Sequence, residues 1–327
     1  MDQSLISAVY TILIAFVVNI VLCPLIIPHL VRLKFGQNVR SDGPQTHLKK
    51  SGTPTMGGII ILLSFVIASI WFIQVSHQIL ILILVTIGYG LIGFADDYIK
   101  VVKKRSMGLT AKQKILAQCV VTALFVTYLH LNDAASYSSI FIPFTNELQW
   151  NMGILFLPFV FIFMIGSVNS VNLTDGLDGL ASGITVLVST FLLFIAWAMD
   201  SSLVPIAGAA VGSLLGFLLF NSYPAKVFMG DTGSLALGGF VAATAILLHV
   251  PLFFILVGFI YVLEALSVII QVGYFKLTNG KRFFKMAPLH HHFEQSGWTE
   301  TKVVTLFYIV TAILCLVGFL GAQNIFF

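Results

Sequence analysis

Residues 79–97 read ILILILVTIGYGLIGFADD, an apolar run that ends in two adjacent carboxylates, Asp96 and Asp97. A helix needs about 20 mainly apolar residues to cross a bilayer, and this run is close to that length. The rest of the chain has the same character, because 58% of its 327 residues are hydrophobic and 9% are charged, against about 25% in soluble domains. The sequence therefore predicts a membrane protein with polar chemistry at the end of a span.

The sequence predicts ten membrane-spanning helices in one all-α domain covering residues 1–327, without a linker or a repeat. The predicted spans are residues 4–30, 56–75, 79–97, 114–131, 153–169, 180–198, 203–220, 233–249, 252–275 and 304–323. With ten spans, all 17 Lys and Arg residues fall in loops on one side. Basic residues near span ends stay in the cytoplasm, so both termini are predicted to be extracytoplasmic. The basic loops are suited to an anionic lipid or substrate.

One outer loop, residues 132–151, is longer than the others. Its segments 139–144 and 148–150 are predicted to form a short hairpin on the outer surface. Trp150 is expected at the membrane interface, where tryptophan is enriched.

The segment Gly93-Phe-Ala-Asp96-Asp97-Tyr-Ile-Lys100 places two acids at the cytoplasmic end of a span. If the helix continues, Asp96 and Lys100 are four residues apart and share a face, where opposite charges attract. A solvated helix end with ordinary ion pairs explains this segment as well as a functional site does.

The segment Asn169-Ser-Val-Asn172-Leu-Thr-Asp175-Gly-Leu-Asp178-Gly carries two acids and no Lys or Arg. Acids without a local counter-charge are costly so near a membrane and usually mark an ion or substrate site. The alternative is helix capping, in which Asp175 or Asp178 accepts backbone N–H bonds at the start of the next span.

A third segment, Asn221-Ser-Tyr-Pro-Ala-Lys-Val-Phe228-Met-Gly-Asp231-Thr-Gly-Ser, adds a fifth carboxylate on a third loop. Five acids at one membrane level offer hard oxygen ligands that suit Mg²⁺, whereas zinc would require Cys or His pairs at zinc-site spacing. Mg²⁺ fills its remaining positions with water and substrate phosphates. A phosphate-containing substrate is therefore expected.

Basic groups for a phosphate lie nearby in the sequence. Lys50 precedes a Gly-rich entry to the second span, Gly52-Thr-Pro-Thr55-Met-Gly-Gly58, whose backbone N–H groups are suited to an anion. Lys100, Lys104 and Lys112 add positive charge, although each is equally well explained as a lysine that only sets the topology.

The longest cytoplasmic loop contains Met286-Ala-Pro-Leu-His290-His291-His292-Phe-Glu294. Three consecutive histidines cannot all face one metal without a contorted backbone, so contacts to phosphate or sugar by one or two of them are favoured over a purely structural role. In the preceding span, Glu264 and Gln271 are seven residues apart on one helix face. Glu264 lies near mid-span, and an intramembrane Glu is a functional candidate, although a protonated Glu that only packs is the alternative.

Together these motifs resemble the phospho-N-acetylmuramoyl-pentapeptide transferase family, over nearly the whole chain. The most specific segments are Asp42-Gly-Pro with His47 and Lys50, residues 52–58, the Asp96-Asp97 pair, residues 172–179, residues 228–234 and residues 287–294. The acidic motifs are similar to those of the wider superfamily that transfers phospho-sugars to polyprenyl phosphates. The Thr-Met-Gly-Gly and triple-His forms resemble the muramoyl-pentapeptide branch.

The resemblance implies a Mg²⁺-dependent enzyme of the bacterial inner membrane. Its substrates would be UDP-MurNAc-pentapeptide and undecaprenyl phosphate, and its products undecaprenyl-pyrophosphoryl-MurNAc-pentapeptide (lipid I) and UMP. Asp231 would ligate Mg²⁺, and Asp96 or Asp97 would be the base for any proton left on the lipid phosphate. A phosphate monoester with a second pKa near ~6 is largely ionised already, so positioning alone could suffice. The family also suggests a homodimer, and no nucleic-acid partner is expected.

The predicted site residues form two groups. The catalytic candidates are Asp96, Asp97 and Asp231. The substrate-binding candidates are Lys50, Thr55, Lys100, Lys104, Lys112, Asn169, Asn172, Asp175, Asp178, Asn221, Phe228, Gln271, His290, His291 and His292. The family guides two assignments: the nucleotide would lie against Asp175, Asp178, Asn221 and Phe228, with Phe228 stacked on uracil, and the three histidines would meet the sugar-phosphate end.

Two other functions are open at this point. A sister enzyme that uses UDP-N-acetylglucosamine would share the acidic motifs. A secondary transporter would also carry intramembrane acids, but transporter sites usually lie near the midplane, where this chain has only Glu264. UMP release separates an enzyme from a transporter, and substrate competition separates the two enzymes.

Overall fold

The computed structural model describes residues 2–32, 52–72, 74, 76–102, 108–145 and 149–327, so Lys50 and Lys104 lie outside the described residues. The prediction of an all-α membrane protein is confirmed, with one small hairpin as the exception. In chain order the helices are α1 Gln3–Arg32, α2 Gly58–Ser69, η2 Ile70–Phe72, α3 His77–Val102, α4 Ala111–Tyr137, η3 Gly153–Leu155, α5 Phe156–Thr174, α6 Leu180–Ala198, α7 Val204–Asn221, α8 Gly230–Leu247, α9 Pro251–Val257, α10 Phe259–Leu277, α11 Leu289–Glu294 and α12 Glu300–Phe326.

Nine helices among the described residues are long and apolar enough to cross a membrane. Eight of them, α1, α3 to α8 and α12, each coincide with one predicted span. The second predicted span is shorter, because α2 and the 3₁₀ turn η2 together run only from Gly58 to Phe72. All ten predicted apolar segments are therefore helical, but the second is shorter than a full membrane crossing.

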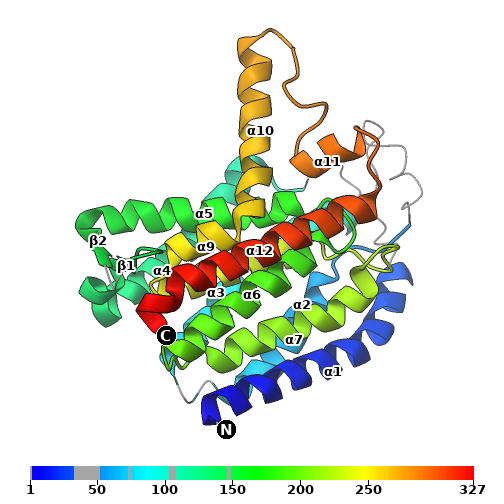
Figure 1. Ribbon diagram of the computed structural model, residues 1–327. Helices are drawn as coiled ribbons and strands as arrows, with labels where there is room; N and C mark the ends of the chain where they lie inside the picture. The colour runs from blue at the N-terminus through cyan, green and yellow to red at the C-terminus, as the bar shows by residue number, and fades with distance from the viewer. Residues whose placement is uncertain (1, 33–51, 73, 75, 103–107, 146–148) are drawn as a thin grey trace.

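The prediction of one continuous span over residues 252–275 is wrong, because the chain breaks at Gly258 into α9 and α10. Glycine is a poor helix former, and a Cβ at Gly258 would lie 2.8 Å from the carbonyl oxygen of Phe254. A residue with a side chain at position 258 would therefore require the backbone at this bend to shift. Figure 1 shows α10 standing away from the other helices, and its free length exposes apolar side chains such as Ile269 and Leu277.

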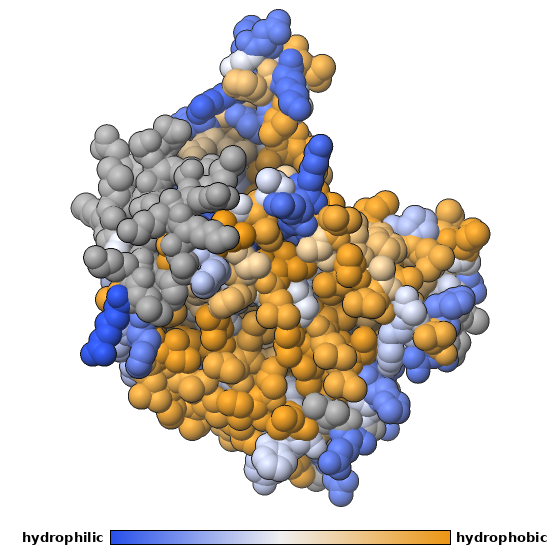
Figure 2. Space-filling view, turned by 180° about the vertical axis from the view of Figure 1, so that it is seen from behind, coloured by the Kyte–Doolittle hydropathy of each residue, from blue (hydrophilic) through white to orange (hydrophobic). Residues whose placement is uncertain are grey.

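The outer surface of the bundle is apolar. Exposed side chains include Val17 of α1, Ile162 of α5 and Leu320 of α12. Figure 2 shows a broad apolar band across the back of the molecule, with hydrophilic side chains gathered at its margins. A patch of this extent marks an interaction or membrane surface, and the long apolar helices identify the surrounding medium as lipid.

Helix α8 lies at the centre of the bundle. In its apolar stretch 89% of the residues are buried, against 22% in α1. It packs along α3 and α5, and α2 crosses it near its start. A Cβ on Gly58 of α2 would overlap the backbone of Gly233, and small residues of this kind let membrane helices approach closely. The first turn of α8 is thereby held beside the Gly-rich entry to α2.

The predicted hairpin is confirmed. Strands β1 (Ser139–Phe141) and β2 (Gln149–Asn151) pair antiparallel, with Ile140 opposite Trp150. Figure 1 shows this hairpin and both termini toward one end of the bundle, and α11 toward the other. Which end faces the cytoplasm stays a prediction, as does the single domain over residues 1–327.

Candidate active site

The three predicted catalytic acids form one cluster. Asp96 and Asp97, near the end of α3, are almost fully buried. One turn earlier, α3 passes close to the start of α8, because a Cβ at Gly93 would overlap the backbone carbonyl of Asp231. Asp96, Asp97 and Asp231 each offer a carboxylate oxygen within 4.8 Å of the others. The close helix crossing therefore joins acids that are more than a hundred residues apart.

Asp97 caps the first turn of α8. Its Oδ2 accepts hydrogen bonds from the amide of Thr232 at 2.9 Å and from the Thr232 hydroxyl at 2.7 Å. Its Oδ1 accepts one from the amide of Asp231 at 3.2 Å. The first amides of a helix have no partner within the helix, and the N-cap residue Met229 offers no side-chain acceptor here. Asp97 thus supplies the cap from a neighbouring helix and fixes the backbone of Asp231.

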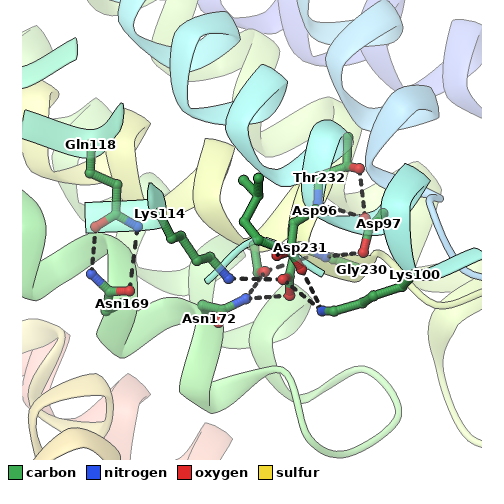
Figure 3. Close-up of polar contacts among 12 residues, drawn as sticks. Asp96, Asp97, Lys100, Lys114, Gln118, Asn169, Asn172, Gly230, Asp231 and Thr232 are labelled. Carbon is green, nitrogen blue, oxygen red and sulfur yellow. Dashed lines mark hydrogen bonds and ion pairs between the residues drawn. The ribbon is translucent and has the colours of Figure 1, made fainter. Parts of the chain in front are cut away.

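Asp231 is the centre of a charged network, shown in Figure 3. Its Oδ2 accepts hydrogen bonds from Lys100 at 3.0 Å and from Lys114 at 2.8 Å. Its Oδ1 accepts one from the side-chain amide of Asn172 at 2.8 Å. Lys100 also pairs with Asp96, four residues earlier, as the sequence predicts. Helices α3, α4, α5 and α8 each contribute to this network.

Asp96 is less fully engaged than Asp97. Its Oδ1 accepts a hydrogen bond from the amide of Leu109 at 2.8 Å. Its buried Oδ2 forms an ion pair with Lys100, and its carboxyl group also lies against that of Asp231. This oxygen can therefore take a proton or face a cation with less disruption than either oxygen of Asp97.

The cluster is suited to a divalent cation. Its three carboxylates are hard oxygen donors of the type that Mg²⁺ prefers, and they lie close enough together to share one ion. Among the described residues, neither His nor Cys belongs to the cluster, so its ligands do not fit a zinc site.

The turn after α5 brings Asp175 and Asp178 to the same region. Burial raises the pKa of Asp175, and the nearby carboxylates, Asp231 first among them, act in the same direction. Asp175 is therefore suited to a cation or to donating a hydrogen bond as the neutral acid. Asp178 accepts a hydrogen bond from the amide of Ala225 at 2.9 Å. The N-cap residue of α6 is Gly179 rather than either acid.

Helix α12 supports this turn through two residues that were not predicted. The amide of Asp178 donates to Glu300 Oε1 at 2.7 Å. The hydroxyl of Tyr308 donates to the carbonyl of Gly179 at 2.6 Å. Neither lies in a recognisable motif, and both are more than a hundred residues from the turn, so the sequence holds no signal that pairs them with it.

Asn221 shapes the loop between α7 and α8. Its buried side-chain amide donates to the carbonyl of Val227 at 3.0 Å. The hydroxyl of Ser182 donates to its oxygen at 2.6 Å. Both polar atoms of Asn221 are thus used within the protein, and a direct contact with a nucleotide stays a prediction.

Phe228 is joined to the Gly-rich entry to α2 through its backbone. Its amide donates to the carbonyl of Pro54 at 2.8 Å, and its carbonyl accepts from the amide of Gly57 at 2.9 Å. Thr55, between them, is buried. The predicted Thr55 and Phe228 therefore lie on two paired segments beside the acidic cluster, while stacking of Phe228 on uracil stays a prediction.

Asn169 joins α5 to α4. Its side-chain amide donates to Gln118 Oε1 at 2.8 Å, and Gln118 donates back to Asn169 Oδ1 at 3.4 Å. Figure 3 places this pair on the Lys114 side of the cluster. The pair steadies the two helices that carry Lys114 and Asn172.

The three histidines have three different contacts within the protein. The partners are Glu264 for His290, Glu294 for His291 and the amide of Lys285 for His292. Of the three, His290 is fully buried and reaches the acidic region, because a Cβ on Gly176 would overlap its Nε2.

Gln271 holds the loop that follows α10. Its Oε1 accepts from the amides of Phe283 at 3.1 Å and Phe284 at 2.8 Å. Its Nε2 donates to the carbonyl of Phe284 at 3.2 Å. A role in substrate binding stays a prediction for Gln271.

Lys114 was not predicted, although it contacts the central carboxylate. The predicted Lys112 is exposed at the start of α4, whereas the Lys114 side chain is only 17% exposed and pairs with Asp231. With 3.6 residues per turn, positions two apart point to nearly opposite faces. Choosing between these lysines requires knowing which face of α4 meets α5.

These features define a class of membrane-embedded protein: an α-helical bundle with carboxylates, lysines and amides gathered at one end of its central helix. Residues 79–249 match the family described as glycosyl transferase family 4. The match runs from α3 to α8 and includes Asp96, Asp97 and Asp231.

The particular family follows from closer relatives. Residues 50–62 match the phospho-N-acetylmuramoyl-pentapeptide-transferase signature 1. Proteins of that name are 51% identical over 314 residues in Clostridioides difficile (95% of this chain, 97% of that protein), 51% over 322 residues in Acetivibrio thermocellus (98% and 96%), and 52% over 308 residues in Halalkalibacterium halodurans (92% and 93%). The chain belongs to the phospho-N-acetylmuramoyl-pentapeptide transferase family, and it is a multi-pass protein of the bacterial inner membrane.

Proposed function

We propose that the protein transfers phospho-MurNAc-pentapeptide from UDP-MurNAc-pentapeptide to undecaprenyl phosphate, which gives lipid I and UMP. This is the first membrane step of peptidoglycan synthesis. The observation that carries the proposal is the cluster of three carboxylates in a chain about half identical to transferases of that name over nearly its whole length. The acidic cluster is the proposed meeting place of the lipid phosphate and the water-soluble nucleotide.

The proposed reaction is an attack by a lipid phosphate oxygen on the sugar-linked β-phosphorus of the donor. The bond from that phosphorus to the bridging oxygen breaks, and UMP leaves with the bridging oxygen and its electron pair. Lys100 and Lys114, which meet at Asp231, are proposed to hold the pyrophosphate. Preorganised positive groups at the place where charge develops are a large source of catalysis.

Mg²⁺ is the proposed cofactor, with Asp231 as its ligand. When bound, it would offset negative charge on the phosphate oxygens. Asn172 keeps one oxygen of Asp231 in place through the 2.8 Å hydrogen bond, and Asp97 fixes the backbone. The side chain and the main chain of the proposed ligand are thus both held by other residues.

Asp96 is proposed as the base in preference to Asp97. Within the described part of the chain, the hydrogen bonds that Asp97 accepts come from the first turn of α8, so taking a proton would weaken that cap. Asp96 has a less engaged oxygen. A base is needed only by the fraction of lipid phosphate that still carries a proton, since the second pKa is near ~6. The larger contribution is positioning.

The donor nucleotide is proposed to bind beside the turn of Asp175 and Asp178 and the loop of Phe228. These two segments are linked by the hydrogen bond from Ala225 to Asp178. His290 lies against the same turn and is proposed to face the sugar-phosphate part of the donor.

The acidic site is proposed to face the cytoplasm, with both termini outside. The support is that the ten predicted spans place all 17 Lys and Arg residues on one side, together with the positive-inside rule. The homodimer suggested by the family stays a prediction.

Donor selectivity tests the proposed function. Purified protein in detergent, given undecaprenyl phosphate and Mg²⁺, is expected to release UMP from UDP-MurNAc-pentapeptide. An excess of UDP-N-acetylglucosamine is expected not to compete. Release of UMP from UDP-N-acetylglucosamine instead would place the protein in the sister branch, and release from neither donor would favour the transporter.

A further inference from the structure

Glu264 and His290 form a pair inside the protein, and neither side chain has measurable exposure. Glu264 Oε1 accepts a hydrogen bond from the backbone amide of His290 at 3.2 Å, and Oε2 lies 3.0 Å from the ring Nδ1. One carboxylate thus holds both the main chain and the ring of one residue. A buried carboxylate is costly unless it is paired and hydrogen-bonded, and His290 supplies both contacts.

The pair joins α10 to α11, which are separated in the chain by residues 278–288. Glu264 lies early in α10, the helix that leaves the bundle, and His290 lies in the short α11. The hydrogen bond to the His290 amide keeps the Glu264 carboxylate beside the ring. Rotation of the His290 ring would therefore break its contact with Oε2, and the ring is restricted to one orientation.

The other ring nitrogen of His290 is directed to the acidic turn. Its Nε2 is buried, has no hydrogen-bond partner among the described residues, and lies so close to Gly176 that a Cβ there would overlap it. Gly176 directly follows Asp175. A buried polar atom without a hydrogen-bond partner is unfavourable, so its retention beside this turn indicates a partner supplied by a ligand.

We propose that Glu264 is a positioning residue, which holds Nδ1 of His290 so that Nε2 is presented to the sugar-phosphate part of the bound donor. The inference rests on the proposed function. Because the carboxylate stabilises a proton on Nδ1, it determines which ring nitrogen is left for the ligand, in the way that carboxylates orient metal-bound histidines. His290 acts on the donor, and Glu264 acts through His290.

Glu264→Gln separates this role from a structural one. The Gln oxygen still accepts the bond from the His290 amide, but its NH₂ group now faces Nδ1 and favours the opposite tautomer. We expect KM for UDP-MurNAc-pentapeptide to rise by about tenfold or more, in line with the loss seen when such oriented histidines lose their carboxylate. KM for undecaprenyl phosphate and the melting temperature are expected to stay close to those of the wild type.

Tyr261→Phe is the matched control. Tyr261 is also buried on α10, one turn before Glu264, and its hydroxyl bonds to Thr185 at 2.7 Å rather than to the site. This variant loses a buried hydrogen bond of the same helix, and its donor KM is expected to stay within about twofold of the wild type. A second test uses the His290→Gln background, in which Glu264→Gln is expected to add no further loss, since residues that act through one another are not additive.

The outcomes separate this inference from the proposed function. A wild-type protein without UMP release would overturn the proposed function before Glu264 is tested. With an active wild type, an unchanged donor KM in Glu264→Gln would overturn the inference, whether or not the melting temperature falls. Fully additive losses in the double variant would also overturn it.

Discussion

Replacing Asp231 with Asn is expected to lower kcat/KM for UMP formation by about 1,000-fold, the upper range for loss of a preorganised charged group. Asn has almost the same size but carries no charge. It therefore offers no anionic ligand to Mg²⁺ and no counter-charge to Lys100 and Lys114, which both contact Oδ2 of Asp231. The measurement is UMP formation by the purified variant, with the melting temperature as a check on folding.

Asp200→Asn is the matched control for the Asp231 variant. Asp200 is exposed in the loop after α6 and has a φ of 50°, a conformation that Asn also tolerates. The control loses one negative charge and is expected to keep wild-type activity. Substantial activity in Asp231→Asn, with its fold intact, would contradict the role given to the cluster.

Replacing Lys114 with Met is expected to reduce kcat/KM by about 100-fold. Met keeps a long apolar side chain in the same space, so the change removes the ammonium group with little effect on packing. Lys114 is the less exposed of the two lysines on Asp231, at 17% against 40% for Lys100, and water can replace it less readily. The expected loss lies in binding of the donor pyrophosphate as well as in turnover.

Two further substitutions calibrate the Lys114 result. Lys276→Met removes an exposed lysine near the end of α10 and is expected to leave the kinetics unchanged. Lys112→Met tests the lysine that was predicted from the sequence. Its kcat/KM is expected to fall much less than that of Lys114→Met. A larger loss of kcat/KM in Lys112→Met than in Lys114→Met would show that the ion pair with Asp231 does not identify the lysine that binds substrate.

The acids of the site could be predicted because carboxylates are rare beside apolar membrane spans. In a chain with only 9% charged residues, unpaired carboxylates beside apolar spans indicate a site without any knowledge of the fold. The ion pair of Asp96 and Lys100 followed from helical spacing. The grouping of Asp96 and Asp97 with Asp231 followed from the shared membrane level and from the family resemblance.

The different structural roles of those acids could not be predicted. That Asp97 caps α8 depends on the crossing of α3 and α8, which Gly93 makes close, and nothing local to either helix reveals the crossing partner. The same holds for Lys114, because the useful face of α4 is decided by its neighbours. Support from Glu300 and Tyr308 depends on α12 and has no local signal at all.

The broken ninth span shows a different limit. Residues 252–275 have the length and composition of one crossing. They contain two glycines, and the helix breaks at Gly258 but continues through Gly273. Glycine is common in membrane helices, so it does not predict a break by itself. The partner of Glu264 could not be predicted either, because it lies 26 residues further along the chain in α11 and no local pattern pairs the two residues.

The central claim, that the carboxylate cluster performs metal-dependent transfer between a nucleotide and a lipid phosphate, is tested most directly by UMP formation under controlled Mg²⁺. We expect purified protein in detergent to form UMP only when UDP-MurNAc-pentapeptide, undecaprenyl phosphate and Mg²⁺ are all present. Chelation with EDTA is expected to stop the reaction, and added Mg²⁺ to restore it. UMP formation that continues at the full rate after chelation, or without the lipid phosphate, would contradict the claim.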